Sequence, residues 1–443
     1  MSNTVPKRIA TAIINSLKGG VVPRIGLGYI EVGRDKEIAA LLRDIDIVGD
    51  GGAAFRFISG KFGSGKSFLL QTIRNYAMDR GFVVVDADLS PERRLTGNKN
   101  QGLATYKELI RNMSTKTKPD GGALQLILEK WITSIKTQII TDEEFDDGTP
   151  EFNKAVEKKI YGIINNLQSM VNGFDFAKVI VSYWKAFSTD NDELKDNALK
   201  WLRGEYTTKT DAKRELGVSV IISDENWYEY IKLFSVFLVG AGYKGMLMLV
   251  DELLNLYKIP NVVSRQYNYE KLLMMYNDTL QGKAQYLGII MCATPQCVED
   301  TRRGIFSYEA LKSRLETGKF TDDTTQDLLS PIIKLSPLTN EDLYVLIEKL
   351  ANIHANLYSY DVNLSEEDMI SFLKMELGRV GAGKNVTPRE IIRDFIEVLN
   401  VLLQNPDKKM EDLLGDDFGL ELSESDVTDS QTQSDFEGFE LDV

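Results

Sequence analysis

A glycine-rich segment at residues 60–67, GKFGSGKS, constrains the fold of this chain more than any other feature. It fits the pattern G-x-x-x-x-G-K-[ST], in which backbone N–H groups surround a phosphate at the start of a helix. An alternating run at 53–59 precedes it, and a helical pattern follows from Ser67. Gly81 ends that helix, and FVVVDAD at 82–88 predicts a buried strand. The order strand, loop, helix, strand predicts a βαβ unit with a phosphate loop.

Each residue type of this loop has a chemical role. Glycines let the N–H groups turn toward a phosphate, Lys66 reaches the β- and γ-phosphates, and the Ser67 hydroxyl is a ligand for Mg²⁺. The alternative is a glycine-rich turn that matches by chance, which the flanking strand and helix disfavour. The residues predicted to bind the phosphates are Gly60, Gly63, Ser64, Gly65, Lys66 and Ser67.

The second element of the predicted site is an acidic pair that follows an apolar run in KGMLMLVDELLNLY, residues 244–257. Asp251 is predicted to hold Mg²⁺ through water, and Glu252 to polarise the attacking water, as in the additional-glutamate class of P-loop ATPases. The alternative is a pair of solvated carboxylates that opens a helix. A third apolar run ends at Thr294, which is predicted to contact the γ-phosphate or orient the water. Its alternative is a strand-ending threonine before a proline-fixed turn.

Composition excludes several other classes of site. The chain has two cysteines, Cys292 and Cys297, and one histidine, His354, which argues against a disulfide framework, a zinc site and a Ser-His-Asp mechanism. No apolar stretch approaches the roughly 18 residues of a membrane span, and the N-terminus lacks the layout of a secretion signal. We therefore expect a soluble cytoplasmic protein.

The formal net charge of −14 is unevenly spread. Residues 411–443 carry 12 acidic and no basic residues, which leaves 54 acidic against 52 basic residues in the rest of the 443-residue chain. The body is therefore not a broadly basic DNA binder. The segment 406–443 is predicted to be a disordered acidic tail. It either docks on a partner or basic surface, or only solubilises the protein.

The phosphate loop, the Asp-Glu pair and the strand-ending threonine, in this order, resemble the AAA+ ATPases, especially their origin-recognition and STAND-like branch. The segment VGRDKEIAALL at 32–42 supports the resemblance through Gly33, Arg34 and Glu37, which match a Gly-Arg-acid-x-Glu element of that branch. The resemblance implies that Arg34 lies near the adenine and the domain hinge. An ordinary charged helix start is the alternative.

Five longer segments resemble the BREX-associated ATP-binding protein family of bacterial phage-defence loci. They lie within residues 8–405 and include DADLSPERRL and DELLNLYKIPN, which are more specific than the phosphate loop. The resemblance implies ATP binding, a defence setting, and a partner such as DNA or a superfamily-2 helicase encoded nearby. The resemblance does not establish which mechanical task the protein performs.

The AAA+ resemblance also implies two arginines at the ATP site. Arg314 would project into the site of a neighbouring copy as an arginine finger, with Arg302 and Arg303 as rivals, and this implies a homo-oligomer. Arg389 would open a lid helix, capped by Thr387, and contact the γ-phosphate. A solvated helix arginine is the alternative for each.

Together these features predict an α/β fold of the AAA+ P-loop type, with a parallel sheet, a helical insertion packed on one edge of it and a helical lid. The predicted boundaries are 1–90 and 243–335 for the core, 91–242 for the insertion, 336–405 for the lid and 406–443 for the tail. Aromatic residues in the insertion indicate a core more readily than a nucleic-acid surface.

The sequence is compatible with three functions. The first is a Mg²⁺-ATP-driven switch or motor of phage defence whose hydrolysis depends on assembly or DNA. The second is a nucleotide-gated scaffold or signalling protein with negligible hydrolysis. The third is a small-molecule kinase, which the Asp-Glu pair and the lid arginine disfavour.

Overall fold

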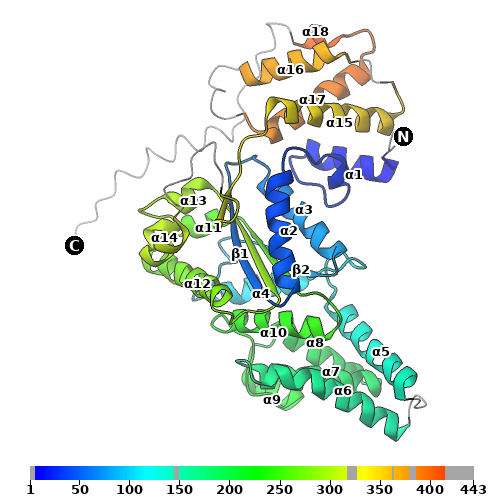
Figure 1. The fold of residues 1–443 in the computed structure, drawn as a ribbon, viewed down its shortest axis with the longest axis vertical. Helices are drawn as coiled ribbons and strands as arrows, with labels where there is room; N and C mark the ends of the chain where they lie inside the picture. The colour runs from blue at the N-terminus through cyan, green and yellow to red at the C-terminus, as the bar shows by residue number, and fades with distance from the viewer. Residues whose placement is uncertain (1–4, 144–148, 317–326, 362–363, 379–385, 415–443) are drawn as a thin grey trace, which may run out of the picture. The chain divides into compact units, whose positions relative to one another are not determined.

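The computed structural model describes residues 5–143, 149–316, 327–361, 364–378 and 386–414 (Figure 1). Two compact units divide this part of the chain. One lies within residues 22–339, and the other combines described residues of 1–21 and 340–443.

A parallel sheet forms the centre of the first unit. Its five strands follow the order β2-β3-β4-β1-β5 and are all parallel to their neighbours. The carboxyl ends of all five therefore meet at one edge, where Asp88 lies opposite Asp251 in the register. This confirms the predicted α/β architecture with a parallel sheet. The strands are β1 (Ala53–Ser59), β2 (Val83–Asp88), β3 (Met246–Asp251), β4 (Leu287–Ala293) and β5 (Ile332–Lys334).

Alternate residues of the strands enter two separate cores. Ile58 and Leu249 pack with α2 (Asp35–Gly49) and α3 (Lys66–Asp79) on one face of the sheet. Phe57 and the other inward residues of the opposite face join a larger core that includes the helices that follow β2. Because side chains alternate across a strand, both faces of these strands are apolar, which the continuous hydrophobic runs predict.

The free edge of the sheet at β2 is closed by a short bridge. Val84 and Ser114 exchange two backbone hydrogen bonds, with N–O distances of 3.0 and 2.8 Å. The buried guanidinium of Arg74 supports this bridge by donating to the Ser114 hydroxyl at 2.8 Å and lying 3.4 Å from Asp86. A covered edge presents fewer unpaired backbone groups to other chains.

Helices fill the chain between β2 and β3. All four tryptophans of the protein lie in or between them and are at least 96% buried, so these aromatic residues belong to the core, as the sequence favoured. The helices are α4 (Gln101–Arg111), α5 (Leu124–Glu143), α6 (Pro150–Gln168), α7 (Gly173–Ser188), α8 (Asp192–Leu202), α9 (Lys209–Leu216) and α10 (Trp227–Gly240).

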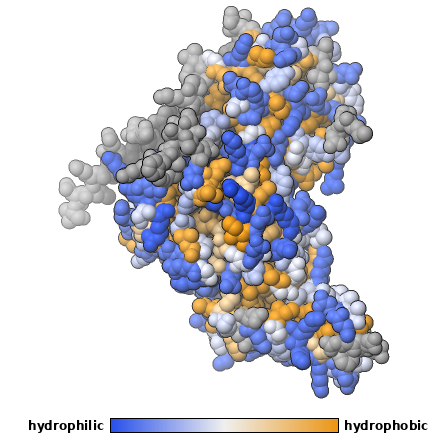
Figure 2. All heavy atoms as spheres, in the orientation of Figure 1, coloured by the Kyte–Doolittle hydropathy of each residue, from blue (hydrophilic) through white to orange (hydrophobic). Residues whose placement is uncertain are grey.

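Further helices follow β3 and β4 in this unit. No helix of the described residues is long and apolar enough to cross a membrane. On the face drawn in Figure 2, hydrophilic residues surround separate hydrophobic patches. The remaining elements are η1 (Leu27–Tyr29), α11 (Leu254–Tyr257), α12 (Val262–Leu280), α13 (Pro295–Glu299), η2 (Ile305–Ser307) and α14 (Glu309–Leu315).

The second unit is helical. Its first helix, α1 (Lys7–Lys18), packs against α15 (Asn340–Tyr358) and α17 (Pro388–Gln404), whereas the sequence placed residues 1–90 with the core. The apolar face of α1 must be buried against another apolar surface, and α15 and α17 provide it. Two further helices are α16 (Glu366–Gly378) and α18 (Met410–Leu413).

His354 is fully buried in this second unit. Its Nδ1 lies 2.9 Å from the Tyr360 hydroxyl and its Nε2 lies 3.4 Å from Oδ1 of Asn400. Burial lowers the pKa of His354, so the ring is neutral in the folded protein near pH 7. Of the predicted acidic tail, α18 is helical, and residues 415–443 lie outside the described residues.

Candidate nucleotide-binding site

The phosphate loop connects β1 directly to α3. Gly63 and Gly65 have positive φ angles of 69° and 94°, which side chains other than glycine rarely adopt. At Gly60 a Cβ would lie 2.5 Å from the Ser64 hydroxyl oxygen, so the loop packs too tightly for a side chain there. The helix begins at Lys66, so the loop ends at a helix N-terminus, where unpaired N–H groups and the helix dipole favour an anion.

Lys66 folds back over its own loop. Its Nζ donates to the carbonyl oxygens of Gly60 at 2.7 Å and Lys61 at 2.8 Å, and lies 5.6 Å from the centre of the Phe62 ring. The ammonium group is thus held within the loop, where a bound phosphate would be. The Ser64 hydroxyl is buried there and has no hydrogen-bond partner among the described residues. A cation and an unpaired donor fit a phosphate group.

Ser67 and Asp251 meet across the site. The Ser67 hydroxyl donates to Oδ2 of Asp251 at 2.6 Å, and Oδ1 of Asp251 accepts from the backbone N–H of Glu252 at 2.8 Å. A hydroxyl and a carboxylate are oxygen ligands of the kind that Mg²⁺ prefers. Ser67 and Asp251 would therefore hold the ion.

The backbone at Glu252 is strained. Its φ angle is 59°, in the left-handed region that glutamate seldom adopts. The turn is tied to both neighbouring strands, because Leu253 N–H donates to the Cys292 carbonyl at 3.2 Å and Asn255 Nδ2 donates to the Leu89 carbonyl at 2.9 Å. Such strain persists only where surrounding contacts impose it, and it is typical of functional sites.

Thr294 directly follows β4 and lies beside the loop. The N–H of Gly60 donates to the Ala293 carbonyl at 3.2 Å, which brings the end of β4 against the start of the phosphate loop. The Thr294 hydroxyl accepts from the N–H of Cys297 at 3.2 Å and caps α13, and the residue is 7% exposed. The sequence left open a strand-ending threonine before a proline-fixed turn, and the cap of α13 is a finding of the structure. The hydroxyl hydrogen remains a donor for another group.

Arg34 reaches the phosphate loop from the start of α2. Its Nη2 donates to the Ser64 carbonyl at 3.0 Å and its Nη1 to the Ser336 carbonyl at 2.8 Å. Nη1 also lies 3.4 Å from Oε1 of Glu37, and both side chains are at most 7% exposed. Gly33, with a φ of 62°, turns the chain before Arg34. The predicted Gly-Arg-acid-x-Glu element therefore contacts the backbone of the loop.

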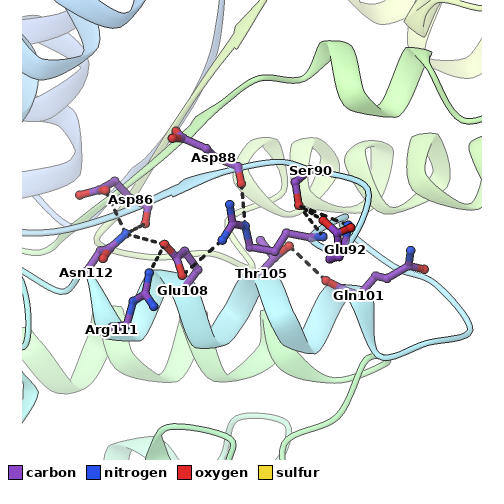
Figure 3. A network of polar contacts seen from close by, with 10 residues as sticks. Asp86, Asp88, Ser90, Glu92, Gln101, Thr105, Glu108, Arg111 and Asn112 are labelled. Carbon is purple, nitrogen blue, oxygen red and sulfur yellow. Dashed lines mark hydrogen bonds and ion pairs between the residues drawn. The ribbon is translucent and has the colours of Figure 1, made fainter. Parts of the chain in front are cut away.

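Asp88 is a site residue that the sequence analysis did not identify. It ends β2 opposite Asp251, and Figure 3 shows its carboxylate turned away from the polar network around Glu108. That network holds the Asp88 backbone, since Arg93 Nε donates to the Asp88 carbonyl at 3.0 Å and Arg93 Nη1 lies 3.6 Å from Oε2 of Glu108. Burial, followed by the charge of Asp251 and other acids, raises the pKa of Asp88. Its position directly after an apolar strand was the available signal.

The predicted arginines lie on α14, on the segment before η2 and at the start of α17. Arg314 is exposed on α14 and donates to the Ala310 carbonyl of its own helix at 2.7 Å. Arg302 is also exposed, whereas the guanidinium of Arg303 stacks 5.4 Å from the Tyr257 ring centre. Arg389 is exposed at the start of α17, where Thr387 forms the predicted cap, and it belongs to the other unit.

The structure thus brings together residues from widely separated segments of one unit. The residues gathered at this end of the sheet are Arg34, Gly60, Gly63, Ser64, Gly65, Lys66, Ser67, Asp88, Asp251, Glu252 and Thr294. Cys292, in β4 near the loop, is buried, and burial raises the pKa of its thiol well above the ordinary value. Cys292 is therefore a core residue of the site.

Comparison with known proteins identifies the family. No curated protein matches the chain. The model of one family, described as "BREX system ATP-binding protein BrxC/D", matches residues 5–417. This match covers nearly the whole chain and includes the phosphate loop, the Asp251-Glu252 pair and the helical unit. The resemblance found in the sequence is confirmed, and the chain belongs to the family of BREX system ATP-binding proteins BrxC/D.

Proposed function

We propose that this protein binds ATP with Mg²⁺ and hydrolyses it, as an AAA+ type switch or motor of a phage-defence system. The observation that carries this proposal is the 2.6 Å hydrogen bond between Ser67 and Asp251, with Glu252 next to them. A hydroxyl from the phosphate loop and a carboxylate from another strand end converge where a metal-bound phosphate would lie. The strand order β2-β3-β4-β1-β5, with β4 between the strands that lead to these two residues, also supports it.

The roles follow from the contacts. The ammonium of Lys66 would leave the carbonyls of Gly60 and Lys61 and neutralise the β- and γ-phosphates. When bound, Mg²⁺ neutralises charge on the phosphate oxygens. Glu252 would accept a proton from the attacking water, and its strained turn would hold the carboxylate in place. The Thr294 hydroxyl would donate to the γ-phosphate or to this water.

We further propose that hydrolysis depends on assembly or on DNA. The exposed Arg314, or Arg302, would supply an arginine to the site of a neighbouring copy, and Arg389 would act from the helical lid at 336–405. The helices of 91–242 would form an insertion for a partner such as DNA or a superfamily-2 helicase. Family membership supports a defence partner in general terms.

The test is steady-state release of phosphate from ATP over a series of protein concentrations, with and without double-stranded DNA. Lys66→Ala and Glu252→Gln are measured in parallel. We expect turnover that rises with protein concentration or DNA and disappears in both variants, while Glu252→Gln still binds ATP. If both variants hydrolyse ATP at the wild-type rate, the proposed site is refuted.

Two other outcomes separate the competing functions. Lys66-dependent ATP binding without turnover at any concentration would favour the nucleotide-gated scaffold. ATP loss accompanied by a phosphorylated small molecule instead of free phosphate would favour the kinase. Analysis of both products in the same reaction distinguishes these cases.

A further inference from the structure

The guanidinium of Arg34 lies between the phosphate loop and the chain that leaves the sheet after β5. It donates to the carbonyl oxygens of Ser64 and Ser336, and the residue is 5% exposed. A buried guanidinium needs acceptors on several sides, because an unpaired buried charge is strongly unfavourable. These backbone acceptors, together with the Glu37 carboxylate 3.4 Å from Nη1, hold the group in place.

The contact with Ser64 orients a donor of the phosphate loop. The Ser64 carbonyl and the Gly65 N–H belong to one peptide unit, and the described residues contain no cis peptide bond. In a planar trans peptide the C=O and N–H bonds point in opposite directions. The hydrogen bond that holds the Ser64 oxygen toward Arg34 therefore directs the Gly65 N–H to the other side of the loop.

The loop needs such a contact because its glycines are flexible. Gly63 and Gly65 flank Ser64, both have positive φ angles, and glycine adopts many other conformations at little cost. Without Arg34 the peptide between Ser64 and Gly65 could rotate. A charge-assisted hydrogen bond to the carbonyl also polarises the peptide and strengthens its N–H as a donor.

We propose that Arg34 is a positioning residue for phosphate: it aims the Ser64–Gly65 peptide at the phosphates instead of contacting the base. Through Ser336 the same side chain ties the loop to the segment that leads to α15. This inference rests on the proposed function, since it assumes that the loop binds a nucleotide. It predicts that Arg34 acts equally on every ligand that places a diphosphate group, such as the β- and γ-phosphates of ATP, in the loop.

Arg56 provides a matched control. Its Nη1 donates to the carbonyls of Leu329, at 2.6 Å, and Ser330, and its Nε and Nη2 donate to Asp44 at 2.6 and 2.8 Å. Arg56 therefore holds the chain before β5 with the chemistry that Arg34 uses after β5. Its contacts are with Asp44 and this segment, and none of them involves the phosphate loop.

The experiment compares ATP, GTP and inorganic pyrophosphate, the last as a probe without base or sugar. Calorimetry at constant Mg²⁺ measures their affinities for the wild type, Arg34→Lys, Arg34→Gln and Arg56→Lys. Loss of one charge-assisted hydrogen bond should weaken all three ligands by the same factor, about 10-fold, in both Arg34 variants. Arg56→Lys should lower the melting temperature and leave the three affinities unchanged.

Other results would overturn the inference. A changed ratio of ATP to GTP affinity with unchanged pyrophosphate binding would show that Arg34 contacts the base. Unchanged affinities in a folded Arg34 variant would refute any role of Arg34 in phosphate binding. Two substitutions are made so that the test still holds if one variant does not fold. If ATP binding is Lys66-dependent but insensitive to Arg34, only this inference fails. If the wild type binds none of the ligands, the proposed function fails as well.

Discussion

Ser67 and Asp251 are 184 positions apart in the chain, yet the hydroxyl of one lies 2.6 Å from the carboxylate of the other. Ser67 comes from the first turn of α3 and Asp251 from the end of β3. The contact exists because parallel strands present their carboxyl ends, and the helix that follows β1, at the same edge of the sheet. It is the contact at which a metal ion would join the two segments.

This contact predicts how ATP affinity depends on Mg²⁺. Ser67→Ala and Asp251→Asn should each weaken Mg²⁺-ATP binding by about 10- to 100-fold, because each removes an interaction of roughly 1.5–3 kcal/mol with a charged group. Both should have little effect on binding measured in EDTA. Ser67→Thr keeps the hydroxyl and is the control that should retain wild-type affinity. Equal losses with and without Mg²⁺ would contradict the predicted metal site.

The left-handed backbone of Glu252 predicts a trade-off between stability and activity. Glu252→Gly and Glu252→Ala both remove the carboxylate and should both abolish hydrolysis. They differ in backbone strain, since alanine retains the Cβ that makes a φ of 59° unfavourable. Allowing for the greater entropy of glycine in the unfolded chain, the glycine variant should be more stable by about 0.5–1 kcal/mol. Chemical denaturation measures this difference. An alanine variant as stable as the glycine variant would argue against a strained turn.

Asp88 should make the protein less stable as the pH rises. Its folded-state pKa is raised, chiefly by burial and then by Asp251, so the folded protein holds this proton more tightly than the unfolded chain does. Stability is therefore lost from the unfolded pKa, near 3.9, up through the raised folded pKa. Asp88→Asn should raise the melting temperature at pH 7 in EDTA, and the gain should vanish toward pH 4. Glu92→Gln, in the exposed loop after β2, is the control. A gain that persists at pH 4 would point to another cause.

His354 predicts the opposite dependence on acid for the helical unit. Burial lowers its folded-state pKa, so the unfolded chain binds a proton more readily. Stability is fully present above the unfolded pKa of about 6.5 and is lost as the pH falls from there toward the lowered value. Because His354 is the only histidine of the chain, its ring signals report this titration directly by NMR. His354→Gln should flatten the stability profile between pH 7 and 5 while costing stability at pH 7. An unchanged profile would exclude His354 as the source.

Several features were predictable because their signals are local. The phosphate loop, the strands before and after it, and the Asp251-Glu252 pair after an apolar run each appear within a short segment. The core position of the insertion's tryptophans followed from their helical spacing. Asp88 carried the same signal as Asp251, an acid at the end of an apolar run, but nothing in the sequence says that β2 and β3 are neighbours.

Other features required contacts between distant segments. The partners of α1 could not be read from its amphipathic pattern, because such a face packs equally well on any apolar surface. Arg34 donates to the carbonyls of Ser64 and Ser336, and backbone carbonyls, which every residue possesses, leave no trace in the sequence.

The sequence alone therefore determined that the chain has a loop for phosphate, acids to accompany it and membership of a BREX ATP-binding family. Those properties depend on contiguous residues, whose torsions and side chains are set locally. Only the tertiary structure shows that Ser67 donates a hydrogen bond to Asp251 and that Asp88 lies opposite Asp251 in the sheet. It also shows that Arg34 donates a hydrogen bond to the Ser64 carbonyl of the loop. The order of the strands and the packing of distant segments bring these groups into contact. A local sequence pattern does not specify which distant segment will become its neighbour.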